Sequence, residues 1–418
     1  MTKLDAQRSY ASLRGRAGLH AASPRPRKRA RDLESRIGTV ERMTELGRAR
    51  AATLAVFFVN GLGIGAWSAA IPPLKVAFAL SDGRLSLILL AFAGGAVLFM
   101  PIGGAVAPRW APTGITTSRA AFAFTLSFAL PLLASDALAL AVATFGMGAA
   151  NGLLDVSMNA HASVVERRWS APIMSSFHAA FSIGGLAGAG VGAAFLYFGA
   201  SAPSLLAAVG VLGFAAVALA SRALGSGERR NASGYPPAWP ARAFFALATI
   251  AFLLFLAEGA IIDWSGVYLA SIGASAAFAS AGFATFSIAI VTGRLLGDRV
   301  VARYGRMFVV SAGGLVAAAG FGLAAGSLHI ASLLVAYAMV GAGLANVVPA
   351  LFSASAGFGS SPGQGIATVA TAGYAGLLTG PPFVGAIAAW ESLRLGFAAL
   401  AATACAAALI SIFATSSE

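Results

Sequence analysis

Long apolar runs separated by short polar connections dominate the chain. Twelve of these runs have roughly the 20 residues that a helix needs to cross a bilayer. They cover about residues 51–72, 84–107, 114–134, 137–160, 173–197, 201–221, 243–270, 275–297, 307–327, 330–352, 364–388 and 394–414. Inside a bilayer every backbone polar group needs an internal partner, which a helix provides. The pattern therefore predicts an all-α polytopic membrane protein with twelve transmembrane helices.

Basic residues alternate along the connections between these runs. The connections after even-numbered helices contain Arg109, Arg119, Arg167, Arg168, Arg222, Arg229, Arg230, Arg242, Arg299, Arg303 and Arg306. Those after odd-numbered helices contain only Lys75, Arg84 and Arg394. Since Lys and Arg accumulate in cytoplasmic loops, both termini are expected in the cytoplasm.

Short internal matches indicate two copies of a six-helix unit. Residues 146–151 (GMGAAN) match residues 341–346 (GAGLAN), and Trp67-Ser68 matches Trp264-Ser265 at nearly the same offset. The sequence thus predicts two pseudo-symmetric six-helix bundles. We place these bundles at residues 51–222 and 243–414, joined by a Gly/Pro/Ser-rich cytoplasmic linker over 223–242 and followed by a cytoplasmic C-terminus, 415–418.

Composition supports this class and separates the first 50 residues from the rest. Hydrophobic residues make up 58% of the chain and charged residues 10%, against about 25% charged in a soluble domain. Residues 1–50 contain 13 Lys and Arg and 5 Asp and Glu, which gives +8 of the total +13. We interpret them as a basic, disordered cytoplasmic tail near anionic lipid. A nucleic-acid site is not expected, because no folded nucleic-acid module follows. Translation from Met43 remains an alternative.

The connection between the eighth and ninth helices is the most charged segment of the membrane region. It reads GRLLGDRVVARYGR over residues 293–306 and resembles the signature loop of the major facilitator superfamily, G-x-L-x-D-R-x-x-x-R-x-G-R. In that family the Asp caps a neighbouring helix end and pairs with Arg, so that the loop latches one conformation. The resemblance implies a conformational latch formed by Gly293, Asp298, Arg299, Arg303 and Arg306. A basic loop that only sets topology is the alternative.

Ionisable residues inside the predicted spans are the main candidates for function, because such residues are costly in lipid unless they face a cavity or a partner. Asn151, Asp155 and Asn159 recur every four residues and so share one helix face. Residues 152–159 resemble the fucose-permease-like branch, in which an acid at the position of Asp155 is a proton and substrate site. The resemblance implies proton coupling at Asp155 and substrate binding at Asn151 and Asn159. A structural pairing of Asp155 with Arg167 or Arg168 remains open.

His178 and Ser182 share a face of the fifth helix. Residues 176–185 resemble a smaller group around a rhizopine-locus membrane protein, MosC-like, and this resemblance extends from about residue 50 to 414. We expect proton coupling at His178 and substrate binding at Ser182. The alternative is a neutral histidine that only packs.

The seventh helix holds two carboxylates, Glu258 and Asp263, which lie about 140° apart around the helix. We expect Glu258 in the cavity as a proton-coupling group and Asp263 nearer the outer mouth. Trp67 and Trp264 are repeat equivalents that would stack on a solute, although an interface belt is a competing interpretation. Asn346, the equivalent of Asn151, is also expected to bind substrate.

The resemblance implies a secondary active transporter in the inner membrane, which moves a sugar, polyol or sugar-like compound by alternating access together with a proton. The branch's essential helix 1 Asp is absent, with Ser68 in its place, so coupling would rest on Asp155 with His178 or Glu258. Neither an enzyme, a metal, a cofactor nor ATP-driven transport is expected, because no nucleophile–base pair, ligand cluster or phosphate loop is present. A monomer is expected. An exporter of amphipathic compounds and a transport-dead solute sensor are the alternatives.

Overall fold

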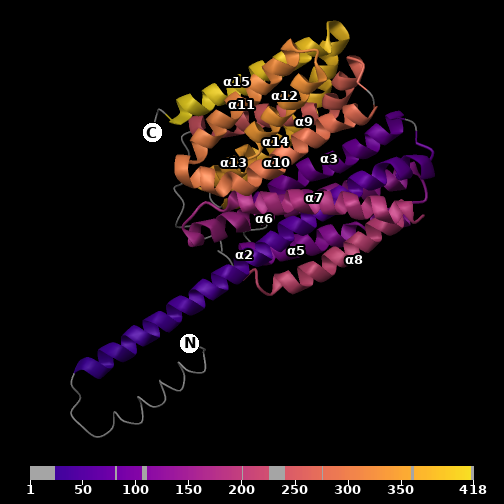
Figure 1. Cartoon of the computed structure of the whole chain (residues 1–418). Coiled ribbons are helices and arrows are strands. Elements are labelled where there is room, and N and C mark those ends of the chain that lie inside the picture. Colours follow the sequence, from indigo (N-terminus) through magenta and orange to yellow (C-terminus); the bar gives the residue numbers. More distant parts are fainter. Residues whose placement is uncertain are drawn as a thin grey trace. The chain divides into compact units, whose positions relative to one another are not determined.

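The computed structural model describes residues 24–80, 82–105, 111–199, 201–225, 241–274, 276–358 and 362–415, where every regular element is a helix (Figure 1). The first six spans correspond to α2 (Pro24–Ala77), α3 (Asp82–Ala105), α5 (Thr113–Ser127) with η1 (Leu130–Leu133), α6 (Ala137–Trp169), α7 (Met174–Tyr197) and α8 (Ala202–Ser221). The last six correspond to α9 (Ala241–Ser271), α10 (Ala276–Tyr304), α11 (Arg306–Gly326), α12 (Ile330–Leu344) with α13 (Val347–Ser355), α14 (Pro362–Trp390) and α15 (Leu393–Thr415).

All twelve predicted spans are therefore helical, and the predicted fold class is confirmed. Among the described residues, nine helical stretches are long and apolar enough to cross a membrane on length and composition alone. α7, α10 and α14 occupy the other three predicted spans. The tenth span is interrupted, because α12 ends at Leu344 and α13 begins at Val347.

Two helices extend well beyond the apolar runs that predicted them. α6 continues to Trp169 and α10 to Tyr304, whereas the runs end near residues 160 and 297. Arg, Glu and Leu propagate a helix as well as most apolar residues do. The apolar run thus marks how much of the helix suits a membrane, and not where the helix ends.

The chain divides into two compact units, residues 1–49 and 50–418. In the first unit, residues 24–49 are helical as part of α2, so the disorder expected for the tail does not extend over them. This segment is rich in Ala, Arg, Leu and Glu, which are good helix formers. Residues 1–23 and residues 226–240 of the predicted linker lie outside the described residues.

Within residues 50–418, the helix contacts repeat between the two halves. α3 packs on α6 and α5 on α8 in the first half, and the equivalent helices α10 on α12 and α11 on α15 in the second (Figure 1). The halves meet where α3 contacts α14 and where α7 contacts α10. These are the second, eleventh, fifth and eighth spans, which exchange under the predicted two-fold relation. The contacts therefore have the predicted pseudo-symmetry.

Candidate solute cavity and its closure

A partly open cavity of about 370 Å³ lies between the two halves. Four helices of each half contribute to it: α2, α3, α6 and α7, and α9, α10, α13 and α14. Its polar lining consists of Asn60, Asn151, Asp155, His178, Glu258, Arg294 and Tyr374. The other nine lining residues are Ile, Phe, Met, Val and Leu. Its volume lies at the lower end of the range for small-molecule sites.

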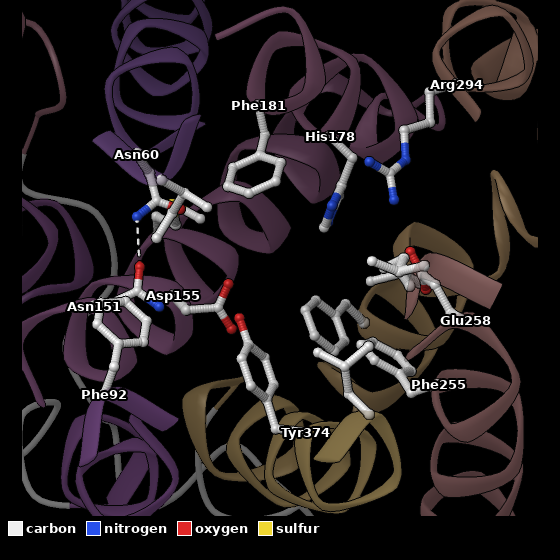
Figure 2. A pocket seen from close by; sticks show the side chains of 16 residues that line it. Asn60, Phe92, Asn151, Asp155, His178, Phe181, Phe255, Glu258, Arg294 and Tyr374 are labelled. Carbon is white, nitrogen blue, oxygen red and sulfur yellow. Dashed lines mark hydrogen bonds between the residues drawn. The ribbon is translucent and has the colours of Figure 1, made fainter. Parts of the chain in front are cut away.

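One polar group of the cavity gathers around Asp155. Nδ2 of Asn60 donates to Oδ1 of Asn151 at 2.9 Å, and the Tyr374 hydroxyl lies on the same side of the cavity (Figure 2). Figure 2 shows this hydroxyl beside the Asp155 carboxylate. Asp155 is 8% exposed, and its Oδ2 has no hydrogen-bond partner among the described residues. A buried carboxylate that points into a cavity without a partner is costly when charged, so it suits a proton or a cation.

A second polar group contains His178, Glu258 and Arg294, which lie across the cavity from Asn60 and Asn151 (Figure 2). Nε of Arg294 donates to the carbonyl of Ala345 at 3.1 Å, and its Nη1 donates to Oγ of Ser182 at 2.6 Å. Glu258 supplies an attractive charge to this guanidinium. The bond to Ser182 joins α10 to α7, so Arg294 connects the cavity to the contact between the halves.

His178 of the second group is held mainly by packing. Its Nε2 is 3.2 Å from Oδ1 of Asn159. Its ring contacts Phe57 and Phe352 at centroid distances of 5.4 and 5.8 Å. This arrangement is compatible with both interpretations of His178, because the residue lines the cavity and is also packed.

Five residues predicted to bind substrate are not among those that line the cavity, namely Asn159, Ser182, Trp67, Trp264 and Asn346. Each contacts a lining residue or a neighbouring helix instead. Asn159 donates to the Asp155 carbonyl at 2.8 Å, Trp67 stacks on Phe92, and Trp264 donates to the Pro381 carbonyl at 3.0 Å. Asn346 donates to the Gly293 carbonyl at 2.9 Å. These side chains thus stabilise the helices that form the cavity wall. Their direct contact with a solute stays a prediction.

The membrane end at which α3, α6, α8, α10 and α13 finish is termed the basic end. Two carboxylates meet the first turn of α7 there. Asp298 of α10 accepts from the backbone N–H of Ser176 at 3.1 Å and from its hydroxyl. Glu166 of α6 accepts from the N–H groups of Ile173 and Met174 at 3.0 and 3.3 Å. Carboxylates at a helix N-terminus satisfy its free N–H groups and its dipole.

Glu166 also joins the two halves. Its Oε2 accepts from the hydroxyl of Ser353 in α13 and lies 3.6 Å from Nη2 of Arg306. The space between these residues is about 10 Å³, which is roughly the size of one water molecule. The two halves are therefore in close contact at the basic end.

These contacts involve two residues of the predicted latch, and their role as a conformational latch stays a prediction. Asp298 does cap a neighbouring helix, as the resemblance implied. Asp298 forms no ion pair with Arg299 or Arg303 within the described part of the chain, and both of these arginine side chains are exposed. Arg306 pairs with Glu166 instead.

Comparison with known proteins shows which family the sequence matches. The family model of the Major Facilitator Superfamily matches residues 53–361. An uncharacterised MFS-type transporter of Yersinia pestis is 35% identical over 358 residues, which cover 84% of this chain and 92% of that protein. The membrane protein MosC of Rhizobium meliloti is 32% identical over 354 residues, covering 82% and 84%.

The chain belongs to the Major Facilitator Superfamily. It is a membrane transporter of that fold, and the match to MosC confirms the predicted resemblance. Two solved structures of FucP, a fucose:proton symporter of E. coli, match with TM-scores of 0.72 and 0.69 at 16% and 17% identity. Each match covers 87% of this chain and 98% of FucP.

Four residues of the cavity and its closure were not predicted from the sequence: Asn60, Glu166, Arg294 and Tyr374. Arg294 and Glu166 carried a usable signal. Arg294 lies within an apolar run, where a charge marks a cavity or a partner. Glu166 is an acid in the last turn of a helix, where the helix dipole opposes it unless it has a partner. Asn60 and Tyr374 gave no comparable signal, because a single polar residue in a span is common.

Proposed function

We propose that the protein is a secondary active transporter that moves a small polar solute, a sugar, polyol or sugar-like compound, by alternating access with a proton. The observation that carries the proposal is the position of Asp155. Its unpartnered carboxylate points into a cavity that both halves form and that is closed at the basic end.

Alternating access requires contacts that can break and form again. Beside α7, the closed end is held by hydrogen bonds and one ion pair among Glu166, Ser176, Asp298, Ser353 and Arg306. Water can replace each of these partners, so the net free energy of each contact is small. An apolar interface of the same area would be harder to reopen on every cycle. The polar closure therefore supports a moving gate.

Proton coupling is proposed to rest on Asp155, together with Glu258 and His178. A charged carboxylate without a counter-ion is costly in this apolar surrounding. A proton on Asp155 removes that cost, and its loss restores it. The solute and the proton would thus be linked through Asn151 and Tyr374, which line the same cavity as Asp155.

The basic end is proposed to face the cytoplasm of an inner membrane, with both termini on that side. This orientation follows from the excess of Lys and Arg in the connections at that end. Both six-helix bundles lie in one chain, and we propose that the monomer transports.

The test is uptake of labelled solutes by proteoliposomes that contain the purified full-length chain, with and without an imposed proton gradient. Sugars and polyols form the first panel, since one structural relative is a fucose:proton symporter. Wild type should accumulate a solute only with the gradient. Asp155→Asn should abolish accumulation while solute exchange continues.

Asp136→Asn is the matched control for this variant. Asp136 is the N-cap of the same helix and accepts from the N–H of Ala139 at 2.8 Å. Asn caps a helix as well as Asp does, so transport should be unchanged. If Asp155→Asn accumulates solute at the wild-type rate, the assignment of the proton site is wrong.

A second candidate, an exporter of amphipathic compounds, is favoured by the nine apolar side chains that line the cavity. The same vesicles distinguish the two functions. An exporter would move dye-like amphipathic compounds against the direction of the proton gradient and would leave sugars and polyols in place.

A further inference from the structure

Arg294 is a buried cation with no carboxylate among its hydrogen-bond partners in the described residues. It is 8% exposed and lines the cavity. Burying a guanidinium in a membrane protein costs several kcal/mol. Its two hydrogen bonds go to neutral acceptors, the Ala345 carbonyl and the Ser182 hydroxyl. A neutral donor can serve such acceptors, as Asn346 does for the Gly293 carbonyl on the same pair of helices.

One edge of the guanidinium remains available. Nε and Nη1 make the two protein contacts, and Nη2 forms no hydrogen bond with any residue that the structure describes. Figure 2 shows the guanidinium directed toward the cavity beside His178. A planar guanidinium with free N–H groups matches a carboxylate in shape and charge.

Charge balance in the cavity also favours a carboxylate as the ligand of Arg294. Glu258 is the lining carboxylate that attracts Arg294, whereas Asp155 lies across the cavity with no counter-ion. A bound solute anion would compete with Glu258 for the guanidinium. A proton on Glu258 removes that competition, so one solute anion and one proton together leave the net charge of the cavity unchanged. A phosphate ester, with nearly two charges at neutral pH, would not be balanced in this way.

We propose that Arg294 binds a carboxylate of the solute, and that the transported compounds are hydroxylated organic acids of the sugar-acid type. The amides of Asn60 and Asn151 and the hydroxyl of Tyr374, across the cavity, would contact the hydroxyl groups of the same solute. This inference rests on the proposed transport function and narrows its substrate class.

The test compares hydroxylated solutes with the same six-carbon backbone that carry different charged groups. Gluconate, glucose, glucosamine and glucose 6-phosphate are added to the detergent-purified full chain, and the thermal midpoint and binding affinity are measured. Uptake of each labelled compound into proteoliposomes is then measured with an inward proton gradient. Gluconate should stabilise the protein and accumulate, and the other three should bind at least about 10-fold more weakly, as expected from the loss of one charge-assisted contact.

Variants of Arg294 connect the selectivity to this side chain. Arg294→Gln should weaken gluconate binding about 10- to 100-fold while the weak affinity for glucose stays the same. Arg294→Lys keeps the charge and should recover part of the loss. Arg394→Gln is the matched control, because Arg394 also donates Nε to a backbone carbonyl, that of Ala325 at 2.9 Å, but is exposed and lies outside the cavity lining.

Three results would overturn the inference. The first is equal or tighter binding of glucose or glucosamine than of gluconate. The second is no measurable binding of gluconate by wild type. The third is loss of glucose and gluconate affinity alike in Arg294→Gln, which would indicate a structural role. Failure of the transport function would appear differently, as gluconate binding in detergent without any gradient-driven uptake.

Discussion

The two seams that join the halves at the basic end are related by pseudo-symmetry but close by different means. At the α7–α10 seam, Asp298 accepts two hydrogen bonds from Ser176. At the α3–α14 seam, Gly104 lies so close to α14 that a Cβ there would overlap the Gly363 carbonyl and the Ala367 side chain. The position equivalent to Asp298 is Pro108, which lies outside the described residues. Duplication has thus kept the helix arrangement while the closing contacts diverged.

The two seams are expected to tolerate different substitutions. A polar contact loses about 1–3 kcal/mol when one partner is removed, and water can substitute for the missing group. A close backbone contact fails when a single side chain is added, because packed helices cannot move apart locally without losing other contacts. We therefore expect the steric seam to be more sensitive to substitution than the polar seam.

The largest effect is expected for Gly104→Val. The added side chain would collide with backbone and Cβ atoms of α14, so the basic end could not close. Proton-driven uptake should fall at least about 10-fold, since overpacking costs of 1–3 kcal/mol or more act directly on the closed state. A thiol at Ala350, introduced in a Cys405→Ser background, should become accessible to a probe from the basic end.

Gly94→Val is the matched control for the steric seam. Gly94 lies on the same helix, and no heavy atom lies within 4 Å of the position that its Cβ would take. This variant should transport as wild type does. If Gly104→Val retains more than half of the wild-type rate, the close approach of α3 to α14 is not needed during the cycle.

Glu166→Ala should have the next largest effect. It removes an acceptor for Ile173, Met174 and Ser353 and the partner of Arg306. The closed state should lose about 2–3 kcal/mol relative to the open state, because these bonds go to a charged group. Labelling of the thiol at position 350 should rise sharply. Glu166→Gln keeps one acceptor oxygen, so its labelling should lie between that of wild type and that of Glu166→Ala. Labelling that is unchanged in both variants would contradict the role of Glu166.

Glu166 also shows where prediction from sequence ends. Apolar runs located all twelve helices, because bilayer thickness fixes the length that they need. The same runs predicted that the fourth helix ends near residue 160, so Glu166, Arg167 and Arg168 were assigned to a basic loop. The structure extends α6 through this segment, and the acid then contacts three other helices. Contacts of this kind depend on where a helix continues beyond the membrane, which hydropathy does not report.

The lining of the cavity could be predicted only in part, because spacing along one helix does not report its contacts with other helices. A spacing of four placed Asn151, Asp155 and Asn159 on one face, and the structure puts the first two on the cavity wall. Each step of four residues rotates by about 40° around the helix, so Asn159 turns from the cavity to His178. The rotation of Trp67 and Trp264 toward Phe92 and Pro381 depends on neighbouring helices, and no spacing within one helix specifies it.

Asp298→Ala tests the polar seam from the other half. The variant leaves the N–H and hydroxyl of Ser176 without their acceptor, and water can replace it only in part. We expect a cost of about 1–2 kcal/mol for the closed state, a slower turnover and increased labelling at position 350. Solute affinity should change only through this shift. A large loss of affinity without altered labelling would show that Asp298 acts on the solute site and not on the gate.

Arg306→Gln should have the smallest effect on the seams. Its pair with Glu166 is long, at 3.6 Å, and the arginine side chain is 43% exposed. Exposed ion pairs contribute about 0–1 kcal/mol and are screened by salt. Uptake should therefore fall less than about threefold, and the difference from wild type should vanish when both are assayed in high salt. The hydrogen bonds that Glu166 makes to α7 and Ser353 would hold the seam without the arginine. If Arg306→Gln instead matched Glu166→Ala in thiol labelling, the charge pair, and not these hydrogen bonds, would close the basic end.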